Sequence, residues 1–163
     1  MIPSVLPTYS RAPLSFVKGE GSWLIEQDGR RFLDLGAGIA VNALGHAHPA
    51  LVAALTEQAG QLWHTSNLYE IPQQQELADR LVALSFADTV FFTNSGTEGT
   101  LMSIRAARAF TGKHKIAKFE GGYHGSHEYV AVSVHPPLEK LDPAGPTPIP
   151  EHPGMPPSVL EDV

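Results

Sequence analysis

The chain has 163 residues, of which 42% are hydrophobic and 17% charged, so it has enough apolar side chains to bury a core. Its 17 acidic and 11 basic residues give a net charge of −6, which argues against a general nucleic-acid surface. The lack of cysteine excludes disulfides and cysteine-ligated metals and fits the cytoplasm. No apolar run approaches the roughly 20 residues of a membrane helix, and the N-terminus does not resemble a signal peptide.

The first part of the chain is predicted to hold an irregular arm, a β-hairpin and a helix. Three prolines interrupt residues 1–15, which should therefore form an arm or a frayed terminus. Asp28-Gly29 stands between two runs of strand formers, 23–26 and 31–34, and this pattern is a strong hairpin signal. A stretch that opens with proline and has apolar residues at helical spacing predicts a helix over 49–61.

The second part alternates helix and strand. Leucines at helical spacing predict a helix over 72–84, which is followed by a predicted strand over 89–93, a helix over 97–110 and a strand over 115–120. A helix between two strands implies a right-handed crossover, a parallel pairing and a ligand site beyond the carboxyl ends of the strands. A further strand over 129–134 should continue the sheet or pair elsewhere. Nine of the 14 prolines fall in the last 29 residues, which predicts an extended segment or linker.

Two motifs lie where the predicted strands 89–93 and 115–120 end. In the first, Asn94-Ser95-Gly96-Thr97-Glu98, the free N–H groups of a helix start and the hydroxyls of Ser95 and Thr97 could hold a phosphate, and Gly96 would let the backbone approach closely. The same hydroxyls could serve as a helix cap alone. The second motif is Gly122-Tyr123-His124-Gly125. Neighbouring loops should present both motifs to one ligand.

Two further motifs precede these two in the sequence: Asp28-Gly29-Arg30-Arg31-Phe32-Leu33-Asp34 and Gly45-His46-Ala47-His48-Pro49. The four motifs, in this order, resemble four motifs of the class III aminotransferases. The resemblance implies the α/β fold of the fold type I pyridoxal phosphate enzymes, here as an N-terminal portion. It divides the chain into an arm and small-domain segment (1–70), the start of the large cofactor-binding domain (71–134) and a proline-rich extended segment (135–163). The paired histidines His46 and His48 are then structural and do not bind a metal.

The resemblance also implies roles for individual residues around pyridoxal 5′-phosphate. Ser95, Gly96 and Thr97 would bind its phosphate, and Tyr123 would stack on its ring. The residues expected beside the cofactor are Glu98 and His124, and those expected to face the substrate across a dimer interface are Asn67 and Tyr69. Each residue also has a simpler explanation. Tyr123 could be an ordinary half-buried aromatic, and His124 could form a local hydrogen bond. Glu98 could interact only with the helix dipole, and Asn67 and Tyr69 could belong to a packed surface loop.

The expected activity is transfer of an amino group between small donor and acceptor substrates by a cytoplasmic homodimer. Family members need a Schiff-base lysine, and no lysine here occupies a matching position, so the catalytic residue is unknown and the 163 residues alone are expected to be inactive. Apolar faces and a sheet edge should then be exposed. Residues 64–69 resemble the acetylornithine and ornithine branch, whereas 118–125 resemble glutamate-1-semialdehyde aminomutase, which leaves an intramolecular transfer open. A non-catalytic fragment that binds pyridoxal phosphate or phosphate is the alternative from another class.

Overall fold

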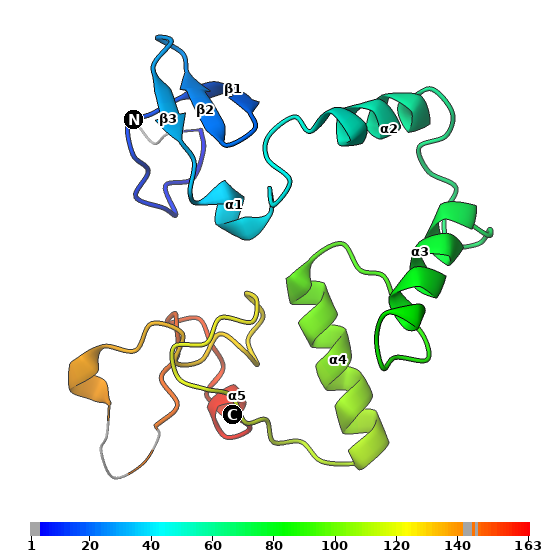
Figure 1. Cartoon of the computed structure of the whole chain (residues 1–163). Coiled ribbons are helices and arrows are strands. Elements are labelled where there is room, and N and C mark those ends of the chain that lie inside the picture. The colour runs from blue at the N-terminus through cyan, green and yellow to red at the C-terminus, as the bar shows by residue number, and fades with distance from the viewer. Residues whose placement is uncertain (1–3, 142–144, 146) are drawn as a thin grey trace. The chain divides into compact units, whose positions relative to one another are not determined.

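Strand formers near the N-terminus build a three-stranded antiparallel sheet in the order β1-β2-β3 in the computed structural model (Figure 1). Its strands are β1 (Phe16–Glu20), β2 (Trp23–Glu26) and β3 (Arg31–Leu33). Leu24 lies opposite Phe32, so the hairpin predicted around Asp28-Gly29 is confirmed. Sequence analysis did not predict β1, which pairs with β2 through a tight turn at Gly21, whose φ is 55°.

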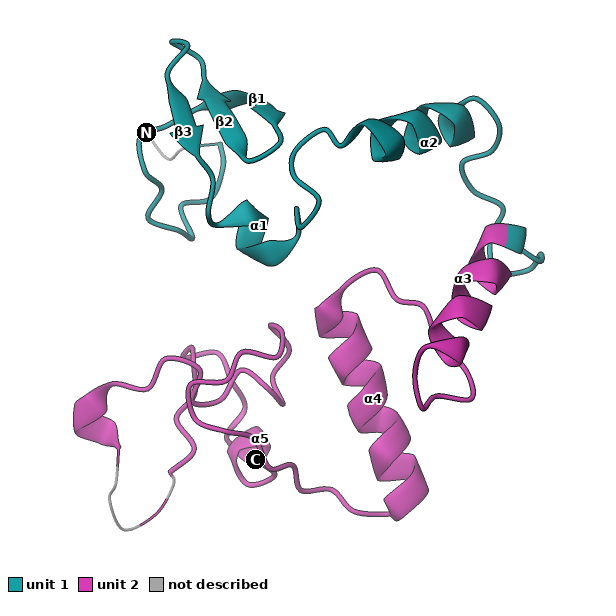
Figure 2. Cartoon of the chain, in the orientation of Figure 1, with its two compact units in different colours: residues 1–72 teal, residues 73–163 magenta. Residues whose placement is uncertain are grey.

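The structure describes residues 4–141, 145 and 147–163. The chain divides into two compact units, residues 1–72 and residues 73–163 (Figure 2). After the sheet, the first unit contains α1 (Ala37–Ala40), a short turn with positive φ at Gly38 and Ile39. It also contains α2 (Pro49–Ala59), which confirms the predicted helix and ends at Gly60. Residues 1–3 of the predicted arm and the prolines at 143 and 146 of the proline-rich segment lie outside the described residues.

Two longer helices open the second unit and confirm the helices predicted over 72–84 and 97–110. α3 spans Pro72–Ala83, and α4 spans Gly96–Thr111. Ser95 caps the start of α4, and Gly112 ends it with a left-handed φ of 68°. Two short helices follow, η1 (Leu138–Lys140) and α5 (Pro157–Leu160). Within the described residues no helix is long and apolar enough to cross a membrane.

The predicted parallel strands are absent from the described part of the second unit. Residues 89–93, 115–120 and 129–134 form no named strand, and the one β-bridge described in this unit is antiparallel, between Val132 and Pro150. Parallel strands are stable when helices cover both faces of their sheet. In the described residues α4 buries none of its side chains and therefore does not act as such a cover, and residues 129–134 contain turns and bends that a continuous ladder excludes. The prediction of a parallel pair was therefore wrong for these residues.

The core of the second unit forms around residues 129–134 instead. Val130, Ala131, Val132 and Val134 are buried, and Met155 and Val159, from the proline-rich C-terminal part, complete the apolar set. The backbone N–H of Ser133 donates to Ile149 O at 2.6 Å, and that of Glu151 donates to Ala131 O at 3.1 Å. Elsewhere large apolar side chains are exposed, Phe110 at 93% for example, which confirms the expected exposure of apolar faces.

Candidate functional site

The start of α4 is held by hydrogen bonds to two side chains, those of Ser95 and Glu98. Ser95 is extended (φ −155°, ψ 158°), and its Oγ accepts a hydrogen bond from the N–H of Glu98 at 3.2 Å. The Glu98 carboxylate in turn accepts from the N–H and Nδ2 of Asn94, at 2.9 and 3.1 Å. A serine followed three residues later by a glutamate is the sequence signature of a capping box, a signal that the sequence analysis did not use, although here the carboxylate bonds Asn94 instead of the backbone N–H of Ser95. Glu98 therefore shapes the turn before the helix.

This cap leaves hydrogen-bond donors free at the helix start. Among the described residues, the N–H groups of Gly96 and Thr97 have no acceptor. A Cβ added to Gly96 would meet no atom within 4 Å, so the space beside this backbone is open. Ser95 Oγ and Thr97 Oγ1 each accept a bond from a backbone N–H, which leaves their hydroxyl protons free to donate. These donors suit a phosphate, which the positive end of the helix dipole also favours.

The second motif packs directly on this helix start. Gly125 has a φ of 112°, and a Cβ there would lie 2.8 Å from both Cα and Oγ1 of Thr97, so only glycine allows this approach. The next residue, Ser126, donates its N–H to Thr97 Oγ1 at 3.2 Å. The structure therefore brings the two motifs together across about thirty residues of sequence, although among the described residues no parallel sheet joins them.

The side chains expected to contact a flat ligand are accessible. Tyr123 is 66% exposed, and its hydroxyl lies 3.1 Å from Ser126 Oγ. The His124 side chain is also exposed, while its backbone carbonyl accepts from Thr100 Oγ1 at 2.8 Å. An exposed phenol held at its hydroxyl by the loop that packs on α4 has its ring faces free to stack.

The loop predicted to face the substrate belongs to the unit of residues 1–72. Asn67 and Tyr69 are exposed there, and the loop turns at Ser66, whose φ is 69°. The N–H of Tyr69 donates to Ser66 O at 3.4 Å, and Trp63 Nε1 donates to Ala59 O at 2.7 Å. These bonds fix the loop internally, and the role of Asn67 and Tyr69 stays a prediction.

The Gly-His-Ala-His-Pro turn is tied to the residue after β3 by a side-chain hydrogen bond that sequence analysis missed. His46 Nε2 lies 2.7 Å from Asp34 Oδ2, and Asp34 Oδ1 accepts from the N–H groups of Gly36 and Ala37. His46 also exchanges two backbone hydrogen bonds with Gly21. The hydrogen bond from His46, followed by that from the Ala37 N–H, lowers the pKa of Asp34.

We expect Asp34→Asn to remove part of the pH dependence of the free energy of unfolding of the unit of residues 1–72. Because the folded-state pKa of Asp34 is lowered, its stabilisation is fully present above the ordinary aspartate pKa of about 3.9 and disappears as pH falls through the folded value. Unfolding midpoints followed by tryptophan fluorescence should therefore differ between wild type and Asp34→Asn at pH 6, and the difference should shrink below about pH 4 and vanish only below the lowered folded-state pKa of Asp34. Asp88→Asn, at an exposed position, is the control. A constant difference at all pH values would contradict the assignment.

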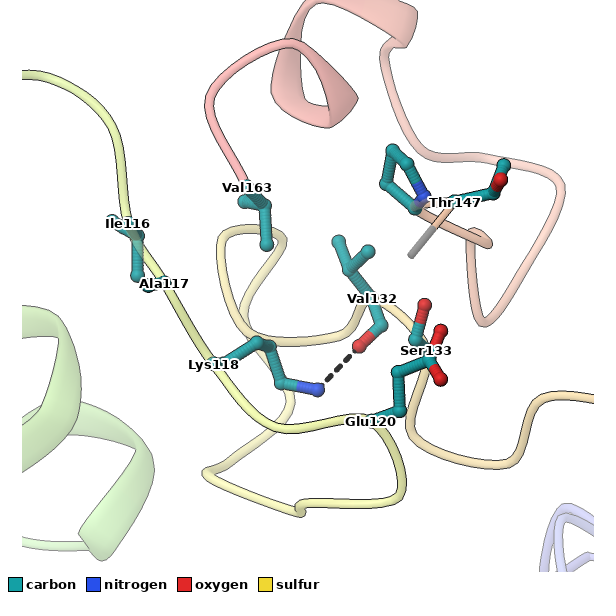
Figure 3. A pocket seen from close by; sticks show the side chains of 9 residues that line it. Ile116, Ala117, Lys118, Glu120, Val132, Ser133, Thr147 and Val163 are labelled. Atoms are coloured by element: carbon teal, nitrogen blue, oxygen red, sulfur yellow. Dashed lines mark hydrogen bonds between the residues drawn. The ribbon is translucent and has the colours of Figure 1, made fainter. Parts of the chain in front are cut away.

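Lys118 lines a separate pocket of about 260 Å³ in the second unit (Figure 3). Its Nζ points to the backbone carbonyl of Val132 and donates to it at 2.5 Å, while the N–H of Gly121 donates to Ser133 O at 2.8 Å. Partial burial lowers the pKa of Lys118, and Glu151 and Glu120 oppose this effect. These two bonds tie together the two ends of the loop that carries Tyr123 and His124.

Known proteins are similar to this chain in sequence and in fold. The family model described as aminotransferase class-III matches residues 6–160. The acetylornithine aminotransferase of Rhodobacter capsulatus is 63% identical over 135 residues, which are 77% of this chain and 33% of that protein. The acetylornithine aminotransferase of Mesorhizobium japonicum is 55% identical over 124 residues, which are 72% of this chain and 31% of that protein.

Solved structures give the same result. An omega-transaminase from Sphaerobacter thermophilus aligns with 95% of this chain and 35% of its own, at a TM-score of 0.83 and 32% identity. The N-acetylornithine aminotransferase of Stenotrophomonas maltophilia K279a aligns with 71% of this chain and 34% of its own, at a TM-score of 0.66 and 42% identity. The chain spans about a third of the length of the curated relatives it matches. The resemblance carried by the motifs is thus confirmed, and the chain belongs to the class III aminotransferase family, with part of the fold of a fold type I transaminase.

Proposed function

We propose that this chain supplies the phosphate-binding helix start and the ring-covering loop of a pyridoxal phosphate-dependent aminotransferase. One observation carries the proposal: the free N–H groups of Gly96 and Thr97 lie at a helix start on which the Tyr123 loop is docked. When bound, the cofactor supplies the electron sink that makes amino-group transfer possible. The residues described here bind and orient it.

Each residue of the two motifs then has a distinct task. The N–H groups of Gly96 and Thr97 and the hydroxyls of Ser95 and Thr97 donate to the phosphate. Tyr123 covers one face of the ring, and His124 lies beside it. Glu98 contributes through Asn94, because its carboxylate holds the turn that leads into α4. None of the five lysines lies in either motif, so we assign no catalytic lysine to this chain.

Acetylornithine is the substrate that the relatives favour. Two proteins that are named for this substrate share 63% and 55% identity with the chain. The stretch 118–125 favours glutamate 1-semialdehyde as a second candidate. In the protein isolated from its native source, amino transfer from acetylornithine to a 2-oxo acid would support the first, and isomerisation of glutamate 1-semialdehyde without an acceptor would support the second. We further propose that the active form is a homodimer in which Asn67 and Tyr69 face the substrate.

Comparison of pyridoxal 5′-phosphate with pyridoxal tests the phosphate assignment. Fluorescence titration of the 163-residue chain should give at least about 100-fold tighter binding of the phosphorylated form, because two free N–H groups and two hydroxyls contact the phosphate, each worth about 1 kcal/mol or more. Equal affinities would overturn the assignment. Borohydride treatment followed by mass spectrometry distinguishes a lysine adduct from the non-covalent binding expected of a phosphate-binding fragment.

A further inference from the structure

The Thr100 hydroxyl is the centre of a small polar cluster just after the start of α4. It lies 2.8 Å from the backbone oxygen of His124, 3.0 Å from that of Thr97 and 3.2 Å from Nε2 of His127. A hydroxyl has one proton to donate and two lone pairs that accept. The shortest of the three contacts joins Thr100 to His124, which is 24 residues away in the sequence. The proton of Thr100 therefore anchors the loop that carries Tyr123 and His124.

This donation assigns the tautomer of His127. Because Thr100 Oγ1 gives its proton to a carbonyl, it accepts a proton from His127 Nε2, and His127 is neutral with its hydrogen on Nε2. The other ring nitrogen, Nδ1, is buried and has no partner in the described part of the chain. A second proton there would be a buried donor with no acceptor. Burial lowers the pKa of His127, and the nearby charge of Glu128 only partly offsets this lowering. The ring is therefore neutral near pH 7.

His127 is in turn connected to the core of the unit. Its backbone carbonyl accepts hydrogen bonds from the N–H groups of Val130 and Ala131, both at 3.1 Å, and both of these residues are buried. The chain of contacts therefore runs from the core through His127 to Thr100 on α4, and from Thr100 to the peptide of His124. Side chains locked by packing and by further hydrogen bonds are what hold a binding group in a productive geometry.

We propose that Thr100 and His127 are positioning residues that fix the His124-Gly125 peptide, and with it the loop that carries Tyr123, on the start of α4. Neither side chain belongs to the motifs that contact the cofactor, and both act through the backbone of His124. That this positioning lets Tyr123 cover the cofactor ring rests on the proposed function, whereas the docking of the loop on α4 does not. Removing the hydroxyl of Thr100 should free the loop while leaving the phosphate donors of Gly96 and Thr97 in place.

Amide hydrogen exchange of the cofactor-free chain tests the docking. The N–H of Ser126, which donates to Thr97 Oγ1, should exchange about tenfold faster in Thr100→Val than in wild type, because loss of one net hydrogen bond opens the loop. Thr100→Ser keeps the hydroxyl and should restore wild-type exchange. The N–H of Ile116, which donates to Asp162 O away from this loop, should be unchanged in both variants and reports on global unfolding. Unchanged exchange at Ser126 in Thr100→Val would overturn the proposal.

Binding of pyridoxal 5′-phosphate tests the consequence for the ring. The visible circular dichroism of the bound cofactor reports how firmly its ring is held, and it should fall several-fold in Thr100→Val and His127→Leu. Affinity for inorganic phosphate should change less than twofold. His127→Gln places an amide nitrogen near the position of Nε2 and should recover most of the signal. If wild type binds no cofactor, the proposed function fails, and the exchange of the Ser126 N–H still decides whether Thr100 docks the loop on α4. If wild type binds the cofactor and Thr100→Val keeps the full circular dichroism signal, the positioning role fails.

Discussion

Replacing Ser95 with aspartate is expected to weaken binding of pyridoxal 5′-phosphate by about 100-fold without destabilising the protein. Aspartate is as good a helix cap as serine, so the bond from the Glu98 N–H is kept. Its carboxylate would lie beside the proposed phosphate and repel it. Two unit charges 4 Å apart near a protein surface interact by about 4 kcal/mol, which is enough to account for the roughly 3 kcal/mol that this change in affinity represents.

Ser103→Asp is the matched control for this experiment. Ser103 is exposed on the same helix, two turns further along, and the change adds the same charge away from the helix start. Titration with the cofactor should give near wild-type affinity for Ser103→Asp, and thermal unfolding should give similar midpoints for both variants. Undiminished affinity in Ser95→Asp would show that the phosphate does not bind at the start of α4. A lower midpoint in Ser95→Asp alone would show that the cap was disturbed.

Replacing Gly125 with alanine should separate the two motifs. The new Cβ would lie 2.8 Å from Thr97 Cα, and the φ of 112° is itself unfavourable for alanine. Relief of the contact requires the loop to move off α4, which breaks the bond between Ser126 and Thr97. We expect a loss of roughly 2–4 kcal/mol in the free energy of unfolding of this unit, from overpacking and backbone strain together. Affinity for the cofactor should fall at least tenfold as Tyr123 moves with the loop.

Gly121→Ala is the control for Gly125→Ala, because it separates the effect of backbone strain from the effect of displacing the loop from α4. Gly121 lies in the same loop with a positive φ of 75°, but a Cβ there would meet nothing within 4 Å. This variant should cost about 1 kcal/mol of stability and leave the affinity for the cofactor nearly unchanged. Urea unfolding compares the stability of Gly125→Ala with that of Gly121→Ala, and cofactor titration compares their affinities. Similar losses of affinity in the two variants would indicate that backbone strain, and not contact with Thr97, governs the site.

The local elements could be predicted because their determinants lie within a few residues. Asp28-Gly29 specifies the turn between β2 and β3, and Gly112 allows the left-handed residue that ends α4. The phosphate-binding interpretation of Ser95 to Thr97 also started from local chemistry, the unpaired N–H groups of a helix start. The bond from the Glu98 N–H to Ser95 Oγ is equally local, because it depends on the spacing of three residues between serine and glutamate.

Sequence by itself determined α2, α3, α4, the hairpin, the two motifs and the family, since each depends on neighbouring residues or on motif order, whereas it did not predict the short α1, η1 and α5. The tertiary structure alone decided which segments pair, and residues 129–134 became a buried segment of turns and bends that has, within the described residues, one antiparallel bridge and no parallel partner. It also decided the contacts of Thr100 with His124 and His127, and of His46 with Asp34. Such contacts join residues 12 to 27 positions apart, and they form only where packing brings the two surfaces together, which no local propensity encodes.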